Sequence, residues 1–464
     1  MIRQLRFSSL VFTCILATGW VALAQDQKNS PQLTAAQVTS YIPAVVLQEK
    51  EIADKFDPYM PWEWYAPLFS SGNTVDLDRN GFRSELLKHH IWFITQSEAV
   101  FAYNLAHAPE NPQVFVSEKP TYNHAELMGL TYMPLKNTQF EVTGAYLASD
   151  WTGYLGPNIF KFDSLLVNQY LLNRKLLLTL GYSNSDAVFQ GKYTGEDTST
   201  GALGVNSIIP FEVGEAHTLA PSLTLNLKYK FSHGLYTLDG IERSQDPKGT
   251  NTENARNKLG LRPIPHGDGA LYLAEFGYKR RGTPGVKSTW FRINGWYNAS
   301  HYQDYSSVKK VLTGAKAHSG AACVAFDQQL TQPDKYLPYR GIYVNLTGQY
   351  APPDVAVYHQ YYQVSLYSKG LFRARPLDMI SLNVNRTVFS RTALNTFEKL
   401  PKALNPQFGN PGWDDSTYVS GTYGYLISHG IVLSTNIAYV RHPTYAPNTL
   451  DNPVIGTAQL AFYF

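Results

Sequence analysis

The sequence predicts an all-β protein: a transmembrane antiparallel β-barrel of about sixteen strands with a short N-terminal extension that is periplasmic or plug-like. Three observations support this fold class. Several segments alternate apolar and polar residues, 32 Tyr, 23 Phe and 8 Trp accompany only 16% charged residues, and the chain ends in the alternating segment GTAQLAFYF. Aromatic girdles and few surface charges are typical of outer-membrane barrels. Composition alone leaves a secreted β-sandwich open, because such proteins are also rich in aromatic residues.

The N-terminus indicates export. Arg3 and Arg6 precede an apolar stretch, and Ala22-Leu23-Ala24 has the small-x-small form of a signal-peptidase site. The predicted organisation is a signal peptide over residues 1–24, a partly helical N-terminal extension over 25–83, and an outer-membrane β-barrel over 84–464.

Charge and hydropathy narrow the possible locations. The chain has 39 Lys and Arg, two of them in the signal peptide, against 36 Asp and Glu, a balance that gives no support to nucleic-acid binding. After the signal peptide no segment approaches the roughly 18 apolar residues that a transmembrane helix needs. A membrane location therefore requires a barrel.

Alternation distinguishes a barrel from a sandwich. In residues 223–231 one phase is Leu, Leu, Leu, Tyr and Phe, whereas the other contains Lys228 and Lys230. Two lysines on the inner phase would be costly in a sandwich core, but a water-filled lumen solvates them. Residues 342–350 repeat the pattern, with Tyr343 and Asn345 on the inner phase.

Such segments predict sixteen strands, an even number. Short turns alternate with long polar loops, as periplasmic turns alternate with external loops in outer-membrane barrels. We expect the last strand to close the barrel against the first, with Phe462 and Phe464 at the periplasmic girdle. The predicted strands lie near residues 86–104, 122–133, 138–149, 160–171, 175–184, 216–231, 235–245, 269–280, 287–299, 320–330, 341–350, 360–368, 379–390, 415–427, 431–442 and 453–464.

Several motifs resemble the bacterial carbohydrate-selective porins. The clearest is GLFRARPLD, Gly370–Asp378, which resembles a turn between two late strands of that family. Residues 272–298, the pair Asp327-Gln328 and the segment 348–354 also resemble family segments, and the likeness covers about residue 82 to the end. The resemblance implies an outer-membrane porin for passive, carbohydrate-selective diffusion of small sugars.

The resemblance has further implications and some departures. Asp163 resembles an acidic position of the family, and the long connection 185–214 resembles the loop that narrows its pore. Bacterial outer-membrane proteins commonly end on an aromatic residue that assembly machinery recognises, which suggests that role for Phe464. The sequence departs from the family pattern at His90, Tyr182, Ser420 and Ala438, which weakens any transfer of sugar specificity.

Pore selectivity is expected from a constriction of lumen-facing side chains and an infolded loop. Pyranose rings present apolar C–H faces to aromatic rings and hydroxyls to charged groups. Trp290, Arg292 and Trp296 share the inner phase of one strand, near Glu275 on the next. The predicted pore-lining residues are Arg292, Trp296, Glu275, Trp290, Lys228, Tyr343, Asn345 and Asp163, and the loop adds Phe189, Tyr193, Glu196 and Asp197. Each candidate could instead be a generic lumen-wall group.

No catalytic, metal or cofactor site is predicted. Asp76-x-Asp78 begins like a calcium loop, but the twelfth position is Leu87 rather than Glu. His89 and His90 would point to opposite faces of a strand, and no G-x-S-x-G element is present.

Three hypotheses therefore remain. The first is a sugar porin whose partners are monosaccharides or short oligosaccharides, outer-membrane lipid and the assembly machinery, with a possible homo-trimer and no nucleic acid. The second is a porin for other solutes such as anions or sugar acids, and the third is a barrel enzyme or a structural surface protein.

Overall fold

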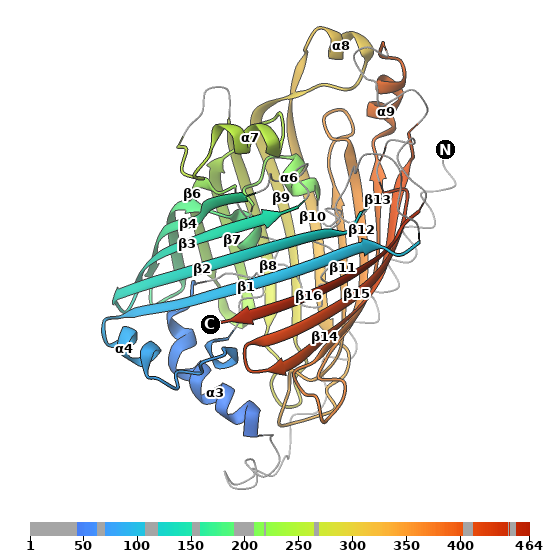
Figure 1. Cartoon of the computed structure of the whole chain (residues 1–464). Helices are drawn as coiled ribbons and strands as arrows, with labels where there is room; N and C mark the ends of the chain where they lie inside the picture. The colour runs from blue at the N-terminus through green and yellow to red at the C-terminus, as the bar shows by residue number, and fades with distance from the viewer. Residues whose placement is uncertain are drawn as a thin grey trace. The chain divides into compact units, whose positions relative to one another are not determined.

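Each strand of the barrel is hydrogen-bonded to a neighbour on both sides. In a computed structural model, sixteen antiparallel strands follow one another in sequence order around a closed barrel, and β1 pairs with β16 (Figure 1). The structure describes residues 44–62, 70–106, 119–150, 158–189, 208–217, 220–263, 269–401, 412–443, 445 and 452–464. The predicted signal peptide, residues 1–24, lies outside the described residues.

The strands are 8 to 15 residues long. They are β1 (Ile91–Asn104), β2 (Thr121–Leu135), β3 (Thr138–Ser149), β4 (Asn158–Leu171), β5 (Leu176–Ser183), β6 (Ser222–Lys230), β7 (Leu235–Arg243), β8 (Ala270–Arg280), β9 (Thr289–Gln303), β10 (Lys316–Gln329), β11 (Gly341–Tyr350), β12 (Tyr358–Lys369), β13 (Met379–Phe389), β14 (Asp415–Ser428), β15 (Ile431–Arg441) and β16 (Val454–Tyr463).

All sixteen predicted strands are confirmed, and β3 and β11 have the predicted bounds. Two boundaries were wrong by about five residues. The first strand begins at Ile91 rather than 86, because Phe82–Lys88 form the helix α4. The sixth begins at Ser222 rather than 216, and the described residues before it, 216–217 and 220–221, lie outside the strand.

The alternation separates the two faces of the barrel wall as expected. On β8, Tyr272 and Phe276 are 48% and 47% exposed, whereas Leu273 and Glu275 between them are buried. Glu275 faces the lumen, where other polar side chains of the wall surround it. On β8 the outer face is therefore apolar, and the inner face carries the polar Glu275 together with Leu273.

The helices and 3₁₀ turns lie at the barrel ends or inside the wall. They are α3 (Ala44–Phe56), η2 (Asp57–Tyr59), η3 (Ser71–Asn73), α4 (Phe82–Lys88), η4 (Ser185–Ala187), α6 (Ile208–Glu212), η5 (Ser232–Gly234), α7 (Thr250–Arg256), α8 (Val308–Leu312) and α9 (Arg391–Glu398). None of the helices among the described residues is long and apolar enough to cross a membrane.

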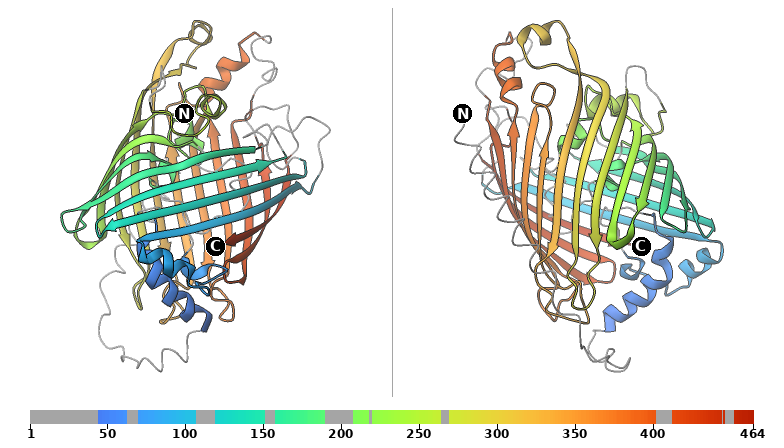
Figure 2. Two further views of the ribbon diagram at one scale, coloured as in Figure 1. Left: turned by 60° about the vertical axis from the view of Figure 1, so that its left-hand side comes forward. Right: turned by 180° about the vertical axis from the view of Figure 1, so that it is seen from behind.

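The two ends of the barrel differ. Helices α3 and α4 lie at the end that holds the short turns and the C-terminus, whereas α7, α8 and α9 lie at the opposite end (Figures 1 and 2). We call these the turn end and the loop end. The N-terminal helical segment is thus present, as the predicted fold class required.

The N-terminal segment is fastened to the turn end by hydrogen bonds. Trp92 of β1 donates through Nε1 to Ser71 Oγ over 2.9 Å. The amide of Gly430, in the turn between β14 and β15, donates to Asn73 Oδ1 over 2.9 Å. The amide of Val75 donates to the carbonyl of Tyr463 over 2.8 Å. The segment therefore joins the first strand and the last two strands.

The acidic stretch from Asp76, which begins like a calcium loop, has a structural role. Asp78 accepts hydrogen bonds from the amide and the hydroxyl of Ser84 in α4, and Asp76 lies 3.3 Å from Arg83. Among the described residues no group of three or more His, Cys, Asp or Glu side chains could hold a metal ion.

The GLFRARPLD motif forms a clamp on the turn between β12 and β13. Arg375 donates twice to the Asp378 carboxylate, each time over 2.9 Å. Tyr423 and the amide of Leu426, both on β14, also donate to Asp378. Gly370 has φ +57°, and a Cβ there would lie 2.3 Å from the Pro376 carbonyl, so the turn requires glycine. The motif therefore stabilises the turn end.

The clamp gives a stability prediction. Burial alone would raise the pKa of Asp378, but hydrogen bonds from Arg375, Tyr423 and Leu426 outweigh burial and lower it. The stabilisation is thus present above the ordinary carboxyl pKa and is lost as the pH falls through the lowered pKa. Asp378→Asn should reduce the free energy of unfolding at pH 7 by about 1.5–3 kcal/mol, the usual range for hydrogen bonds to a charged group.

Urea unfolding in lipid vesicles at pH 7 and in acid measures this effect. Asp414→Asn is the control, because Asp414 and its partner Arg391 are both exposed and such pairs contribute little. Equal effects of the two substitutions would contradict the assigned role of the clamp.

Candidate functional site

The connection between β5 and β6 folds into the lumen. Val188, Phe189, Ile209 and Val213 from this connection are buried in one apolar cluster. The cluster also contains inward-facing residues of β7, β8 and β9: Tyr236, Leu238, Leu271, Leu273 and Trp296. Residues 190–207, which include the candidates Tyr193, Glu196 and Asp197, lie outside the described residues. The described part forms an infolded loop against the β7–β9 wall.

Hydrogen bonds fix the infolded loop on two sides. Trp296 of β9 donates through Nε1 to Glu215 Oε2 over 3.0 Å, and Asn298 donates to the carbonyl of Val213 over 2.6 Å. Gly214, between Val213 and Glu215, has φ +90°. A Cβ there would lie 2.6 Å from Asn298 Nδ2, so only glycine allows the loop to approach β9 this closely. Trp296, predicted to line the pore, therefore lies beneath the loop.

A third anchor joins α6 to the segment before β12. The Glu212 carboxylate accepts from the amides of Val357 and Tyr358, over 2.7 and 3.0 Å. Burial raises the pKa of Glu212 to about 8, although these amides partly offset the shift. Burial also raises the pKa of Glu215 well above its ordinary value, and the nearby carboxylates Glu242 and Asp186 raise it further.

Beside the loop, the inner wall carries a charge pair stacked on an indole. Arg292 Nη1 lies 2.6 Å from Asp327 Oδ2, and its guanidinium carbon lies 3.8 Å from the centre of the Trp290 ring. Asn345 donates to the other Asp327 oxygen over 2.9 Å. Because all these strands expose their apolar phase outward, the pair faces the lumen.

A tyrosine connects this pair to the rest of the wall. Tyr236 donates to Glu275 Oε1 over 2.5 Å and accepts from Trp290 Nε1 over 2.9 Å. The Lys228 ammonium lies 4.6 Å from the centre of the Tyr236 ring. We call these residues the wall cluster: Lys228, Tyr236, Glu275, Trp290, Arg292, Asp327 and Asn345.

Five of the eight predicted pore residues thus lie in the wall cluster, and three do not. Trp296 lies under the infolded loop. Tyr343 stacks on Tyr367 at 5.0 Å, and its hydroxyl donates to the Tyr339 carbonyl. Asp163 on β4 accepts from Asn184 Nδ2 over 3.2 Å.

Two residues of the wall cluster, Tyr236 and Asp327, were not predicted as site residues from the sequence. Tyr236 is 4% exposed and alternates with the exposed Leu235, so the inner phase of β7 contained the signal. From the sequence, Asp327 was noted only as part of the pair Asp327-Gln328, which resembles a segment of the porin family. The anchoring roles of Glu212 and Glu215 had no local signal, because their partners are 81 or more residues away.

The sequence model of a family described as carbohydrate-selective porin, OprB family, matches residues 130–464. This chain belongs to that family. The recognition made from the motifs is therefore confirmed. The protein is a porin that allows passive, carbohydrate-selective diffusion of small sugars through its barrel, and members of such families are channels rather than enzymes.

Solved porin structures are similar to this chain. The high-pH structure of Pseudomonas putida OprB has a TM-score of 0.68 at 16% identity, over 83% of this chain and 97% of that one. The low-pH structure of the same protein has a TM-score of 0.49 at 14% identity, over 84% and 98%. OmpT of Vibrio cholerae in its trimer form has a TM-score of 0.44 at 11% identity, over 81% and 99%. No curated protein sequence shows a significant match.

The buried Glu212 makes loop docking pH-dependent. Since its pKa is raised from 4.5 to about 8, docking is strongest below the ordinary pKa and weakens as the pH rises to about 8. Tyr305, Tyr358 and Tyr445 are the titratable groups near it. Single-channel recordings should show a larger, noisier open conductance at pH 9 than at pH 5.

Two substitutions distinguish the effect of the Glu212 carboxyl on the open conductance from the effects of other titrating groups. Glu212→Gln keeps the acceptor oxygen and should reduce the pH dependence of the open conductance. Glu398→Gln, at the exposed end of α9, is the matched control and should leave that dependence unchanged. Wild-type pH dependence in Glu212→Gln would show that loop docking does not respond to this carboxyl.

Proposed function

We propose that the wall cluster and the infolded loop together form the sugar-selective constriction of this porin. The observation that carries the proposal is the position of the Arg292–Trp290 pair beside the loop. Trp290 packs against the apolar cluster that holds Phe189 of the loop. The Arg292 guanidinium carbon and the Lys279 ammonium lie 3.8 and 3.9 Å from the centre of the Trp290 ring, so a pyranose there would meet these cations rather than a free indole face. Guanidinium and carboxylate groups would bind its hydroxyls.

The direct pairing of Arg292 with Asp327 favours a neutral sugar over an anion, because each charge compensates the other. Lys228 and Lys279 lie beside the single carboxylate of Glu275, so the wall cluster and its neighbour Lys279 carry one more positive charge than negative. An anion-selective pore needs an excess of basic groups at its narrowest point. The alternative porin for anions or sugar acids therefore rests on Lys228 and Lys279.

We also propose that the barrel spans the bacterial outer membrane with its turn end toward the periplasm. Apolar side chains such as Leu227, Phe276 and Ile293 are 41–47% exposed on the outer face, where lipid would cover them. Phe464 is 44% exposed at the turn end, and its backbone pairs with Thr95. This exposure leaves the side chain accessible to assembly machinery, the partner we propose for it.

A polar patch on the outer face supports a homo-oligomer. Glu126 of β2 lies 2.9 Å from His124 and accepts from Ser97 over 2.8 Å. The patch lies between the exposed rings of Tyr122 and Tyr132 on the same phase of the strand. A carboxylate between two aromatic girdles is costly in hydrocarbon. We propose that a second copy of the chain covers the patch, in a homo-oligomer such as the homo-trimer that the sequence left open.

The constriction is tested by sugar block of ion current in planar bilayers. Arg292→Ala should raise the half-blocking concentration of maltose about tenfold, as expected when a hydrogen bond to a charged group is lost. Trp296→Ala should also weaken block, because it releases Glu215 of the loop. Lys161→Ala, a buried lysine on β4, is the control and should block like the wild type. Unchanged block in Arg292→Ala would remove the wall cluster from the sugar site, and unchanged block in Trp296→Ala would remove the infolded loop.

The interface is tested by native mass spectrometry in mild detergent. Glu126→Leu should convert the oligomer to monomers, because it removes the polar contacts of the patch. If lipid covered the patch, the same substitution would instead stabilise a monomeric barrel. Asp54→Leu is the control, since Asp54 is an exposed acid of α3 and lies outside the barrel wall. A wild-type protein that is monomeric in every detergent tested would exclude an interface between copies at the Glu126 patch.

A further inference from the structure

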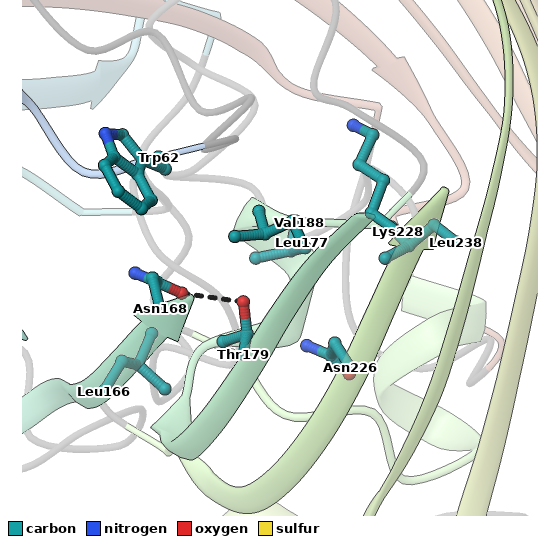
Figure 3. Close-up of a pocket in the computed structure, with 9 residues that line it drawn as sticks. All are labelled: Trp62, Leu166, Asn168, Leu177, Thr179, Val188, Asn226, Lys228 and Leu238. Carbon is teal, nitrogen blue, oxygen red and sulfur yellow. Dashed lines mark hydrogen bonds between the residues drawn. The ribbon is translucent and has the colours of Figure 1, made fainter. Parts of the chain in front are cut away.

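Inside the barrel, the cavity beside the N-terminal segment is small. It lies between Trp62 and the inner faces of β4 to β7 and holds about 20 Å³ (Figure 3). Thr179 donates to Asn168 Oδ1 over 2.7 Å within it. A cavity of this size accommodates about one water molecule. A cluster of basic side chains that permeation does not use lies instead on the outer face, at the loop end of β9 and β10.

The outward-facing residues of β9 and β10 change from apolar to polar at the same height. On β9, Ile293 and Tyr297 are 45% and 53% exposed, and His301 follows on the same phase. On β10 the change occurs between Ala322 and His318. The His318 ring centre lies 5.3 Å from that of His301 and 6.0 Å from that of Tyr297. Exposed tyrosines mark the level at which a barrel leaves the hydrocarbon, so the two histidines lie at headgroup level.

Three lysines lie beyond these histidines, in α8 and at the start of β10. Lys309, Lys310 and Lys316 are all exposed. The acids of the two neighbouring connections, β9–β10 and β11–β12, are Asp304 and Asp354, and Asp304 lies 2.8 Å from Lys310. Among the described residues no carboxylate forms an ion pair with Lys309 or Lys316. This part of the loop end therefore carries an excess of positive charge. We define the basic patch as His301, Lys309, Lys310, Lys316 and His318.

Hydrogen bonds hold the connection that carries the lysines in one shape. Gln303 Oε1 accepts from Lys316 Nζ over 3.3 Å, and Gln303 Nε2 donates to the carbonyl of Ala315 over 3.1 Å. Ser307 caps α8, because its Oγ accepts from the amide of Lys310 over 3.3 Å. In Figure 1, α8 lies at the loop end above β9 and β10. A surface that is already folded binds a ligand at a smaller cost in conformational entropy than a mobile one.

The position of the basic patch around the barrel favours lipid over a second copy of the chain as its partner. In the closed strand order, β10 lies eight strands from β2 in both directions. A cyclic oligomer that covers the Glu126 patch on β2 would therefore leave β9 and β10 on its outer rim, in contact with lipid. The charge of the patch is complementary to phosphate groups, which lysine ammonium groups bind through charge-assisted hydrogen bonds.

We propose that the basic patch binds the phosphorylated headgroup of an outer-leaflet lipid. The lysines bind the phosphate oxygens, and the acyl chains cover the apolar band that begins at Tyr297. Anionic headgroups are attracted to clusters of lysines at a membrane surface in this way. The proposal rests on the proposed orientation, in which the loop end faces the cell exterior, and it is independent of the sugar constriction.

The test is native mass spectrometry of the full mature chain in mild detergent, with lipid A as the probe. The wild type should retain diphosphorylated lipid A and should bind the dephosphorylated form much more weakly. Combining Lys309→Gln with Lys316→Gln should raise the apparent dissociation constant about fivefold for each lysine removed. Combining Lys287→Gln with Lys335→Gln is the matched control, because these exposed lysines lie in turn-end connections and their loss removes the same charge.

Three results would overturn the proposal. The first is equal binding by the lysine variant and the control. The second is loss of wild-type binding in EDTA, because bound divalent cations rather than the lysines would then hold the phosphates. The third is complete displacement of lipid A by millimolar inorganic phosphate, which would make the patch a site for free phosphate.

Sugar block separates this proposal from the constriction. The variant that lacks Lys309 and Lys316 should show the same sugar block as the wild type, because both lysines lie outside the lumen. If Arg292→Ala weakens block but the wild type binds no lipid A, the lipid site is excluded and the constriction stands. If lipid A binding depends on the two lysines but Arg292→Ala leaves block unchanged, the lipid site stands and the wall cluster is removed from the sugar site.

Discussion

Closure of the β1–β16 seam is the constraint on which the rest of the structure depends. A lipid-facing wall has no water to satisfy free amides and carbonyls, so an open sheet edge would be very costly. Nine residue pairs between Gln96–Asn104 and Ile455–Tyr463 remove that edge. Once the wall is continuous, successive side chains of each strand point alternately toward lipid and toward the water of the lumen. The same alternation that covers the outside with Leu, Phe and Tyr therefore delivers Arg292, Glu275 and Asn345 to the lumen.

A wide lumen alone would not select among solutes, and two segments that fold inward from the ends of the barrel narrow it beside the wall. The infolded loop enters from the loop end and is held by Trp296, Asn298 and the amides before β12. The N-terminal segment approaches from the turn end and is held by Gln139. Both intrusions bury apolar side chains against the inner wall, so the narrowing elements are packed in place rather than suspended in water.

The sequence predicted the strands well because side-chain alternation is a local signal that lipid and water enforce at every position. It failed at the starts of the first and sixth strands, since Phe82–Lys88 form the helix α4 and β6 begins only at Ser222. For the site, alternation assigned Trp290, Arg292 and Trp296 to the correct face of the wall. It could not reveal that Glu215 covers Trp296, because that contact joins residues 81 positions apart. Side-chain alternation predicts the face of the sheet on which a residue lies, but not which other segment of the chain packs against that face.

The bonds from Asn73 and Val75 to the β14–β15 turn and to Tyr463 have a consequence for biogenesis. Their acceptors and donors are made last during synthesis, more than 350 residues after the segment that needs them. The segment that contains Asn73 and Val75 must therefore remain undocked until the final hairpin exists. The segment can therefore dock only after β15 and β16 have joined the barrel, and its hydrogen bonds then stabilise the closed barrel.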